Sequence, residues 1–162
     1  MLGQMLYAMQ RGDFAKLRTL VAKDAAENAG AAGAEALHSA AMLGRTDIVK
    51  LLVDMGVDIN AVDGDGTGAL MQAAIYNGSV EMVRLLVEAG WDVNQTFGME
   101  GSKTTALFSA VINEKVEIVK YLLQAGADVN WVSKDSGLTV LAAAQEVSEE
   151  ISALVKAAVA KG

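Results

Sequence analysis

The fold is decided by three similar stretches of sequence: TDIVKLLVDMGVDIN (46–60), VEMVRLLVEAGWDVN (80–94) and VEIVKYLLQAGADVN (116–130). In each stretch apolar residues such as Ile48 and Leu52 recur at helical spacing, while charged residues such as Lys50 fall on the other face. A glycine follows the last periodic residue, where a helix needs a left-handed residue to cap its final carbonyls. The three stretches therefore predict three amphipathic helices, each closed by a glycine.

A shorter pattern precedes each of these helices: ALHSAAMLG (36–44), ALMQAAIYNG (69–78) and ALFSAVINE (106–114). Its small residues would let two antiparallel helices approach closely. After each longer helix comes an asparagine, the first being Asn60, whose short amide side chain can bond the backbone of a turn. A degenerate copy of the pair opens the chain at 5–28, and a partial copy closes it at 138–162. Each unit thus reads as a helix, a turn, a longer helix and an extended loop.

These motifs resemble ankyrin repeats, which have a period of about 33 residues, a first helix of the LHSAA type and a GADVN ending. The resemblance covers nearly the whole chain. It implies an all-α ankyrin-repeat solenoid of helix-turn-helix units joined by β-hairpin-like loops, with about five units including caps. The expected divisions of this single domain (1–162) are an N-terminal capping repeat (1–28), full repeats (29–61, 62–95 and 96–131) and a C-terminal capping repeat (132–162).

The chain departs from the family pattern in two ways. The Thr position of the family's T-P-L-H motif keeps Thr105 and Thr139 but elsewhere holds Glu35 and Gly68, and the chain contains no proline. In length, one extra residue precedes Gly78, and the loop of the fourth unit is about three residues longer than the others. We expect these insertions to lie in loops or on the binding face, where solenoids tolerate them.

Composition excludes several functional classes. The 162 residues carry a formal net charge of −7, which disfavours binding to the phosphate backbone of nucleic acids. There is no cysteine, and no stretch of about 18 apolar residues could span a membrane. The N-terminus does not read as a secretory signal. We therefore expect a cytoplasmic protein that binds neither nucleic acid nor membrane.

Motifs that could hold a cofactor or metal are incomplete. The segment VDGDGTGALMQAA (62–74) mimics a dinucleotide fingerprint, but its flanks are repeat helices and not a βαβ unit. It also begins like a calcium loop, yet Ala74 stands where a bidentate Glu is required. His38 is the only histidine, which prevents a His-rich metal cluster or a second imidazole base. The resemblance implies a structural hydrogen bond for His38. We expect no enzyme activity, no cofactor and no metal.

The resemblance implies binding of other proteins through the finger loops and the concave face of the first helices. The candidate protein-binding residues are Met42, Tyr76, Asn77, Phe97, Met99, Lys103, Ile112, Trp131 and Lys134. Methionine adapts to irregular partners, and Trp and Tyr are favoured hot-spot types. Met42 and Ile112 could equally fill gaps between repeats. Trp91 is expected to pack under the long finger. Deletion of residues 98–100 is expected to spare the fold and to weaken partner binding.

The sequence therefore predicts a monomeric, non-catalytic interaction module with a partly apolar, otherwise acidic concave face and a protein partner that it does not identify. The acidic balance suggests a basic partner, although it could simply serve solubility. Two alternatives stay open. One is a dedicated regulatory, inhibitory or chaperone-like subunit of one specific enzyme. The other, an enzyme in its own right, has the least support because no catalytic set can be assembled.

Overall fold

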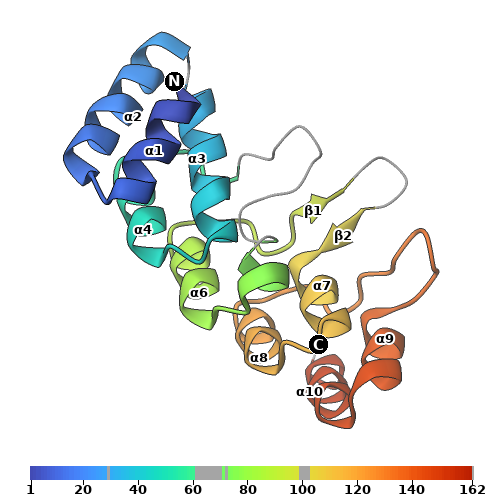
Figure 1. Ribbon diagram of the computed structural model, residues 1–162. Helices are drawn as coiled ribbons and strands as arrows, with labels where there is room; N and C mark the ends of the chain where they lie inside the picture. Colours follow the sequence, from blue (N-terminus) through green and yellow to red (C-terminus); the bar gives the residue numbers. More distant parts are fainter. Residues whose placement is uncertain (29, 61–70, 72, 99–102, 162) are drawn as a thin grey trace.

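The computed structural model describes residues 1–28, 30–60, 71, 73–98 and 103–161, and its elements form five successive units (Figure 1). Four units contain a complete pair of α-helices: α1 (Leu2–Arg11) with α2 (Phe14–Asn28), α3 (Ala31–Met42) with α4 (Thr46–Asp54), α7 (Ala106–Ile112) with α8 (Val116–Gln124), and α9 (Val140–Val147) with α10 (Glu149–Val159). In the third unit a π-helical turn, η1 (Ala73–Asn77), precedes α6 (Val80–Glu88). We call α1, α3, η1, α7 and α9 the first helices, and α2, α4, α6, α8 and α10 the second helices.

The units stack in chain order from the N-terminus to the C-terminus, and the described parts of the loops after α6 and α8 lie on one side of the stack (Figure 1). In the long loop between α6 and α7, β1 (Thr96–Phe97) pairs antiparallel with β2 (Thr104–Thr105). A single antiparallel bridge joins Val132 to Thr139 in the next loop. We call these connections the finger loops and the side they share with the first helices the finger side. The expected all-α solenoid with hairpin-like loops is confirmed.

The core runs along the stack between the helices. Ile48, Val49 and Leu52 of α4 are buried, and the corresponding residues of α6 and α8 repeat the pattern. Facing them, Ala40 and Ala41 of α3 are fully buried, so their small side chains allow the close helix approach that the sequence predicts. Burial of one such leucine side chain contributes about 1.5–3 kcal/mol to the stability of the folded state. Repetition of this interface from unit to unit holds the array together.

Glycines end the second helices as expected. Gly56, Gly90 and Gly126 have φ values of 79°, 99° and 87°, which only glycine adopts without strain. The turn between first and second helices uses the same conformation at Gly44 and Gly78. In the fourth unit this turn position holds Glu114.

Hydroxyl side chains cap the N-termini of four later helices, α6, α7, α9 and α10. Thr105 accepts a hydrogen bond from the Phe108 amide (3.2 Å), and Thr139 caps α9 in the same way. In the second unit, where the family motif has lost its threonine, the cap comes from another helix. The buried carboxylate of Asp24, on α2, accepts a hydrogen bond from the Gly33 amide in the first turn of α3 (2.9 Å). Such caps stabilise a helix by about 1 kcal/mol.

The extra residue of the third unit is absorbed by a π-helical turn. A π-turn accommodates one more residue than an α-turn, and η1 spans the insertion predicted just before Gly78. The side-chain amide of Asn77, at the end of η1, donates a hydrogen bond to the carbonyl of Ala41 in the preceding unit. The irregular turn therefore keeps contact with the neighbouring first helix.

A ladder of asparagine side chains joins the bases of successive finger loops. The side-chain Oδ1 of Asn60 accepts a hydrogen bond from the backbone amide of Asp92 (3.1 Å), and Oδ1 of Asn94 accepts one from the backbone amide of Asp128 (2.7 Å). Asn94 also donates to the carbonyl of Gly126 (3.4 Å). The expected turn-bonding role of these residues is therefore extended, because Asn60 and Asn94 each fix the turn of the following unit.

At the two ends of the stack, the second helices carry polar residues at positions where the internal second helices carry aliphatic ones. Lys16 of α2 is exposed at the position that Ile48 occupies in α4, where it is fully buried. At the other end, Ser152 and Lys156 of α10 replace the aliphatic residues that α8 presents to the next unit. They line a shallow hollow of about 470 Å³ together with residues of α9 and α10. Polar outer faces of this kind are what terminal repeats require for solubility.

Candidate protein-binding surface

Large apolar side chains are exposed where the first helices end on the finger side. Met42 and Leu43, at the end of α3, are 43% and 66% exposed, and Ile112, at the end of α7, is 47% exposed. Half-buried Ile75 lies in η1 between them in chain order. We call Met42, Leu43, Ile75 and Ile112 the apolar row. The side chain of Tyr76 lies outside the described residues, so its predicted place in this row stays a prediction.

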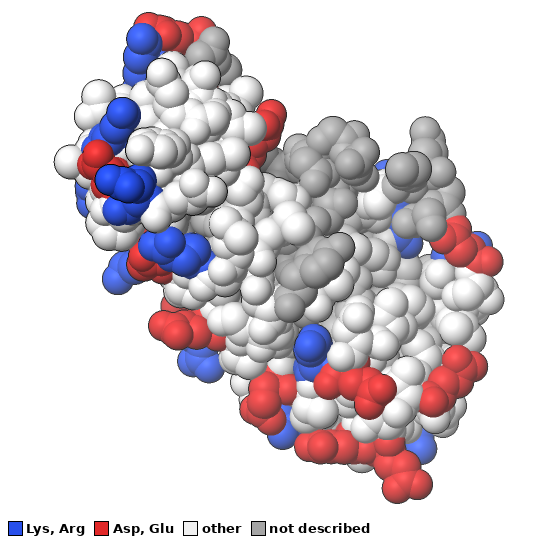
Figure 2. Space-filling view, viewed as in Figure 1, with Lys and Arg blue, Asp and Glu red and all other residues white. Residues whose placement is uncertain are grey.

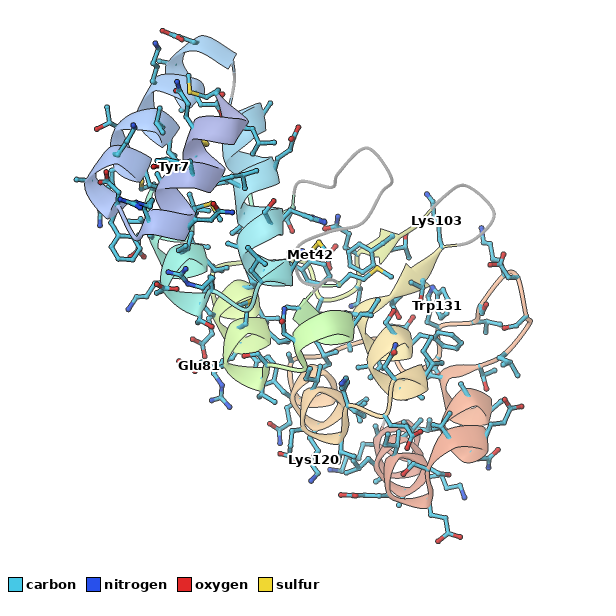
Figure 3. The ribbon with its side chains drawn as sticks, viewed as in Figure 1. Tyr7, Met42, Glu81, Lys103, Lys120 and Trp131 are labelled. Atoms are coloured by element: carbon cyan, nitrogen blue, oxygen red, sulfur yellow. The ribbon has the colours of Figure 1, made fainter. Side chains whose placement is uncertain are left out.

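An aromatic pair lies at the root of the last finger loop. Trp131 is half-buried and meets the ring of Phe108 edge-to-face, with centroids 5.1 Å apart and planes at 60°. Phe108 itself is 7% exposed and belongs to α7, the helix that carries Ile112. Figure 3 places Met42 and Trp131 toward the finger loops, and Glu81 and Lys120 on the opposite side of the helices. Trp131 therefore has a supported ring with part of its surface free.

Phe97 does not project from its finger loop, which corrects the prediction that it touches a partner. Its side chain is only 1% exposed and stacks on Trp91, with ring centroids 5.3 Å apart and planes at 20°. Trp91 is 3% exposed, so the expectation that it packs is confirmed. The two rings supply the apolar contacts that let a lengthened loop fold back onto the stack. The large aromatic side chains of this loop, Trp91 and Phe97, therefore pack within the protein.

The remaining predicted residues are dispersed. Lys103, before β2, and Lys134, in the last finger loop, are both exposed. Asn77 is exposed, but its amide is engaged by the Ala41 carbonyl, so it joins two units. Met99 lies outside the described residues. Binding by each of these residues stays a prediction.

Charged residues are divided unevenly between the first and second helices. The described first helices carry few charged residues: Arg11, Glu35 and Glu146. The second helices from α4 onward carry more of them: Asp47, Lys50, Asp54, Glu81, Arg84, Glu88, Glu117, Lys120, Glu149, Glu150 and Lys156. Figure 2 shows charged side chains along the lower left and bottom edges of the molecule. The connections between units hold the exposed carboxylates of Asp58, Asp92, Asp128 and Asp135. The acidic character of the concave face stays a prediction.

The groups with shifted pKa values are engaged in local contacts. Arg45 donates to both carboxylate oxygens of Asp47 (3.0 and 2.8 Å), which lowers the pKa of Asp47 and raises that of Arg45. The hydrogen bond to Glu117 (2.7 Å) raises the pKa of Lys120. Burial raises the pKa of Tyr121. The ion pairs join residues at the start of one helix or within it.

The described residues offer no competing site with obvious chemistry. Among them no group of three or more His, Cys, Asp or Glu side chains could hold a metal ion. In that same part of the chain, no helix is long and apolar enough to cross a membrane. The hollow between α9 and α10 is lined by the ends of Gln145, Glu149 and Lys156 with small residues between them.

The sequence-based prediction left out one residue of this surface. Leu43 is the most exposed large apolar side chain of the row, and its place beside Met42, in the turn before Gly44, was the available signal.

The comparisons with known proteins agree with the geometry. A family model described as ankyrin repeats (3 copies) matches residues 5–97, 37–132 and 70–159, so that the overlapping matches span nearly the whole chain. The search of curated proteins gave no significant match.

Proposed function

Because the chain belongs to the ankyrin-repeat family, we propose that it is a non-catalytic module that binds a protein partner through its finger side. Ankyrin repeats are generally protein–protein interaction modules, and proteins built from them are typically non-catalytic. The finger side combines the apolar row, the partly free ring of Trp131 and the finger loops. We propose further that the module acts as a monomer, because polar residues cover both ends of the stack.

One observation carries the proposal. Met42, Leu43 and Ile112 are large, apolar and 43–66% exposed at the ends of two first helices. The described second helices of the three middle units, α4, α6 and α8, have no large apolar side chain exposed to this degree. Apolar side chains that are exposed together on one face of an otherwise soluble surface mark interaction sites.

The test measures partner binding by variants of the row and of the aromatic pair. A partner recovered by affinity capture and mass spectrometry is titrated with the wild-type chain and with Met42→Ala, Ile112→Ala and Trp131→Ala. Each substitution at a true hot spot should weaken binding by about 2 kcal/mol or more. Tyr76→Ala extends the same test to the third unit.

Arg84→Ala and Glu81→Ala, on the outer side, are the matched controls and should leave affinity unchanged. Unchanged affinity in all finger-side variants, with folding intact by circular dichroism, would refute the proposed surface. A regulatory subunit of one enzyme would instead give a single stoichiometric complex whose enzyme gains stability on binding.

A further inference from the structure

We infer that Phe108 is a positioning residue for partner binding: its ring holds the indole of Trp131 in the orientation in which a partner meets it. This inference rests on the proposed function, which makes Trp131 part of the binding surface. Phe108 belongs to α7, and Trp131 lies at the root of the loop that follows α8. The contact therefore joins the first helix of the fourth unit to the loop that leaves the same unit.

The contact between the two rings restricts the indole. The centroids of Phe108 and Trp131 are 5.1 Å apart and the ring planes meet at 60°, the edge-to-face arrangement that aromatic pairs favour. An indole on a loop otherwise has several rotamers, and a partner would have to select one of them at a cost in entropy. Phe108 therefore removes part of that cost before a partner arrives.

Phe108 itself is almost out of a partner's reach. Its side chain is only 7% exposed, and its neighbours Leu107 and Ser109 are each 1% exposed. Trp131 is half-buried, so a partner on the finger side can cover part of the indole. An effect of Phe108 on affinity must therefore pass through the ring that it supports, which distinguishes a positioning residue from a contact residue.

The first turn of α7, which carries Phe108, is held by the hairpin before it. The hydroxyl of Thr105 accepts a hydrogen bond from the Phe108 amide (3.2 Å). The hydroxyls of Thr104 and Ser109 lie 3.5 Å apart and share a second hydrogen bond. Both threonines form β2, whose partner strand β1 contains the buried ring of Phe97. The supporting ring thus stands on an anchored backbone, as the precise placement of a binding residue requires.

The backbone of Trp131 is held as well. Its carbonyl accepts a hydrogen bond from the Val140 amide (3.3 Å). Earlier in the same loop, the Asp128 amide is bonded to Oδ1 of Asn94 (2.7 Å). With both backbones fixed, the remaining freedom of the indole is rotation about its side-chain torsions, and this is the freedom that Phe108 restricts.

The first measurement needs no partner. Trp91→Phe leaves Trp131 as the only tryptophan, since the chain has two, and time-resolved anisotropy and acrylamide quenching then report on its ring alone. Phe108→Leu in this background should speed depolarisation and raise the quenching constant about twofold or more, because an aromatic pair energy corresponds to at least that change in population. Phe108→Tyr keeps a ring and should restore both values. Phe97→Leu, which alters the ring contact with position 91, is the matched control and should change neither.

The second measurement is a double-mutant cycle, with a peptide selected from a random displayed library on the wild-type chain as the probe. Phe108→Leu should weaken binding of this peptide about two- to tenfold when Trp131 is present, the range that an aromatic pair supplies. In the Trp131→Ala background the same substitution should have no further effect. Phe108→Tyr should again restore affinity.

The outcomes separate the two claims. If Phe108→Leu weakens binding equally with and without the indole, or leaves anisotropy and quenching unchanged, the inference is overturned while the binding surface stays in place. If no selected peptide loses affinity with Trp131→Ala, the proposed role of Trp131 in binding fails, and the inference fails with it. Phe108→Met, which fills similar space without a ring, repeats both measurements if circular dichroism shows that the leucine variant unfolds.

Discussion

At the scale of single residues, Glu114 is the one described non-glycine residue with a positive φ, at 54°. It closes the turn between α7 and α8, where Gly44 and Gly78 serve the units before it. A side chain in this left-handed conformation brings its Cβ close to the backbone, and the cost is about 1–2 kcal/mol. The fourth unit therefore folds with a local strain that the second and third units avoid.

Replacing Glu114 by glycine should stabilise the protein. Relief of the strain outweighs the greater flexibility of glycine in the unfolded chain, and we expect a net gain of about 1 kcal/mol or slightly less. Urea unfolding followed by circular dichroism measures it. Glu114→Ala keeps the strained φ while removing the carboxylate, so it should give no gain. An equal gain from both variants would assign the effect to the charge and not to the backbone.

At the scale of elements, the finger loops are positioned by bonds between units. Asn94 accepts from the Asp128 amide and donates to the Gly126 carbonyl, across 34 and 32 positions of sequence. Within each turn the preceding aspartate accepts from the asparagine amide, as Asp92 does at 2.9 Å. The loop that carries Trp131 is therefore held in place by the unit before it.

Asn94→Ala should lower the free energy of unfolding by about 1–2 kcal/mol, because two hydrogen bonds between units are lost. Asn130→Ala is the matched control. Asn130 occupies the same turn position, and in the described part of the chain its side chain bonds no other unit. Chemical denaturation of both variants checks the difference. A loss as large for Asn130 as for Asn94 would show that the asparagine acts only within its own turn.

The elements also show how far sequence reasoning reaches. Helical spacing and the closing glycines gave the helices and their order, because both signals are local. The burial of Phe97 could not be read locally, since an aromatic residue in a loop carries no sign of the ring that it meets. The extra residue before Gly78 was visible, but whether it would bulge as a loop or widen a helical turn depends on contacts with Ala41 in the previous unit.

The candidate site was predictable to the same limited degree. The repeat places Met42 and Ile112 at equivalent positions, so their common side follows from the sequence. Exposure does not follow, because the same position could be covered by a neighbouring unit. Net charge has a related limit, since a sum over the chain does not say on which side of the stack each carboxylate lies.

At the scale of the whole molecule, the two ends of the stack differ from the internal units. Ser152 and Lys156 stand where an internal unit would offer aliphatic side chains to the next one, and Lys16 interrupts the matching surface at the other end. The end of a second copy would have to bury the exposed Lys16 or Lys156 without a partner, which is unfavourable.

Ser152→Val combined with Lys156→Leu should convert the last unit into one that resembles an internal repeat. We expect association that increases with protein concentration, because loss of the exposed Lys156 charge leaves that end of the stack apolar. Sedimentation velocity measures it. Glu81→Val with Glu88→Leu adds as much apolar surface on the outer side of α6 and should leave the protein monomeric. If both variants associate alike, the association comes from added apolar surface in general and not from the end of the stack.

The asparagine ladder has a mechanical consequence. Each rung connects only adjacent units, so a stretching force applied to the two termini loads the rungs in series and every interface carries the same tension. The interface that yields first is then the weakest one, and the units behind it stay folded. Under tension the protein should lengthen in discrete steps, each from the unfolding of one unit.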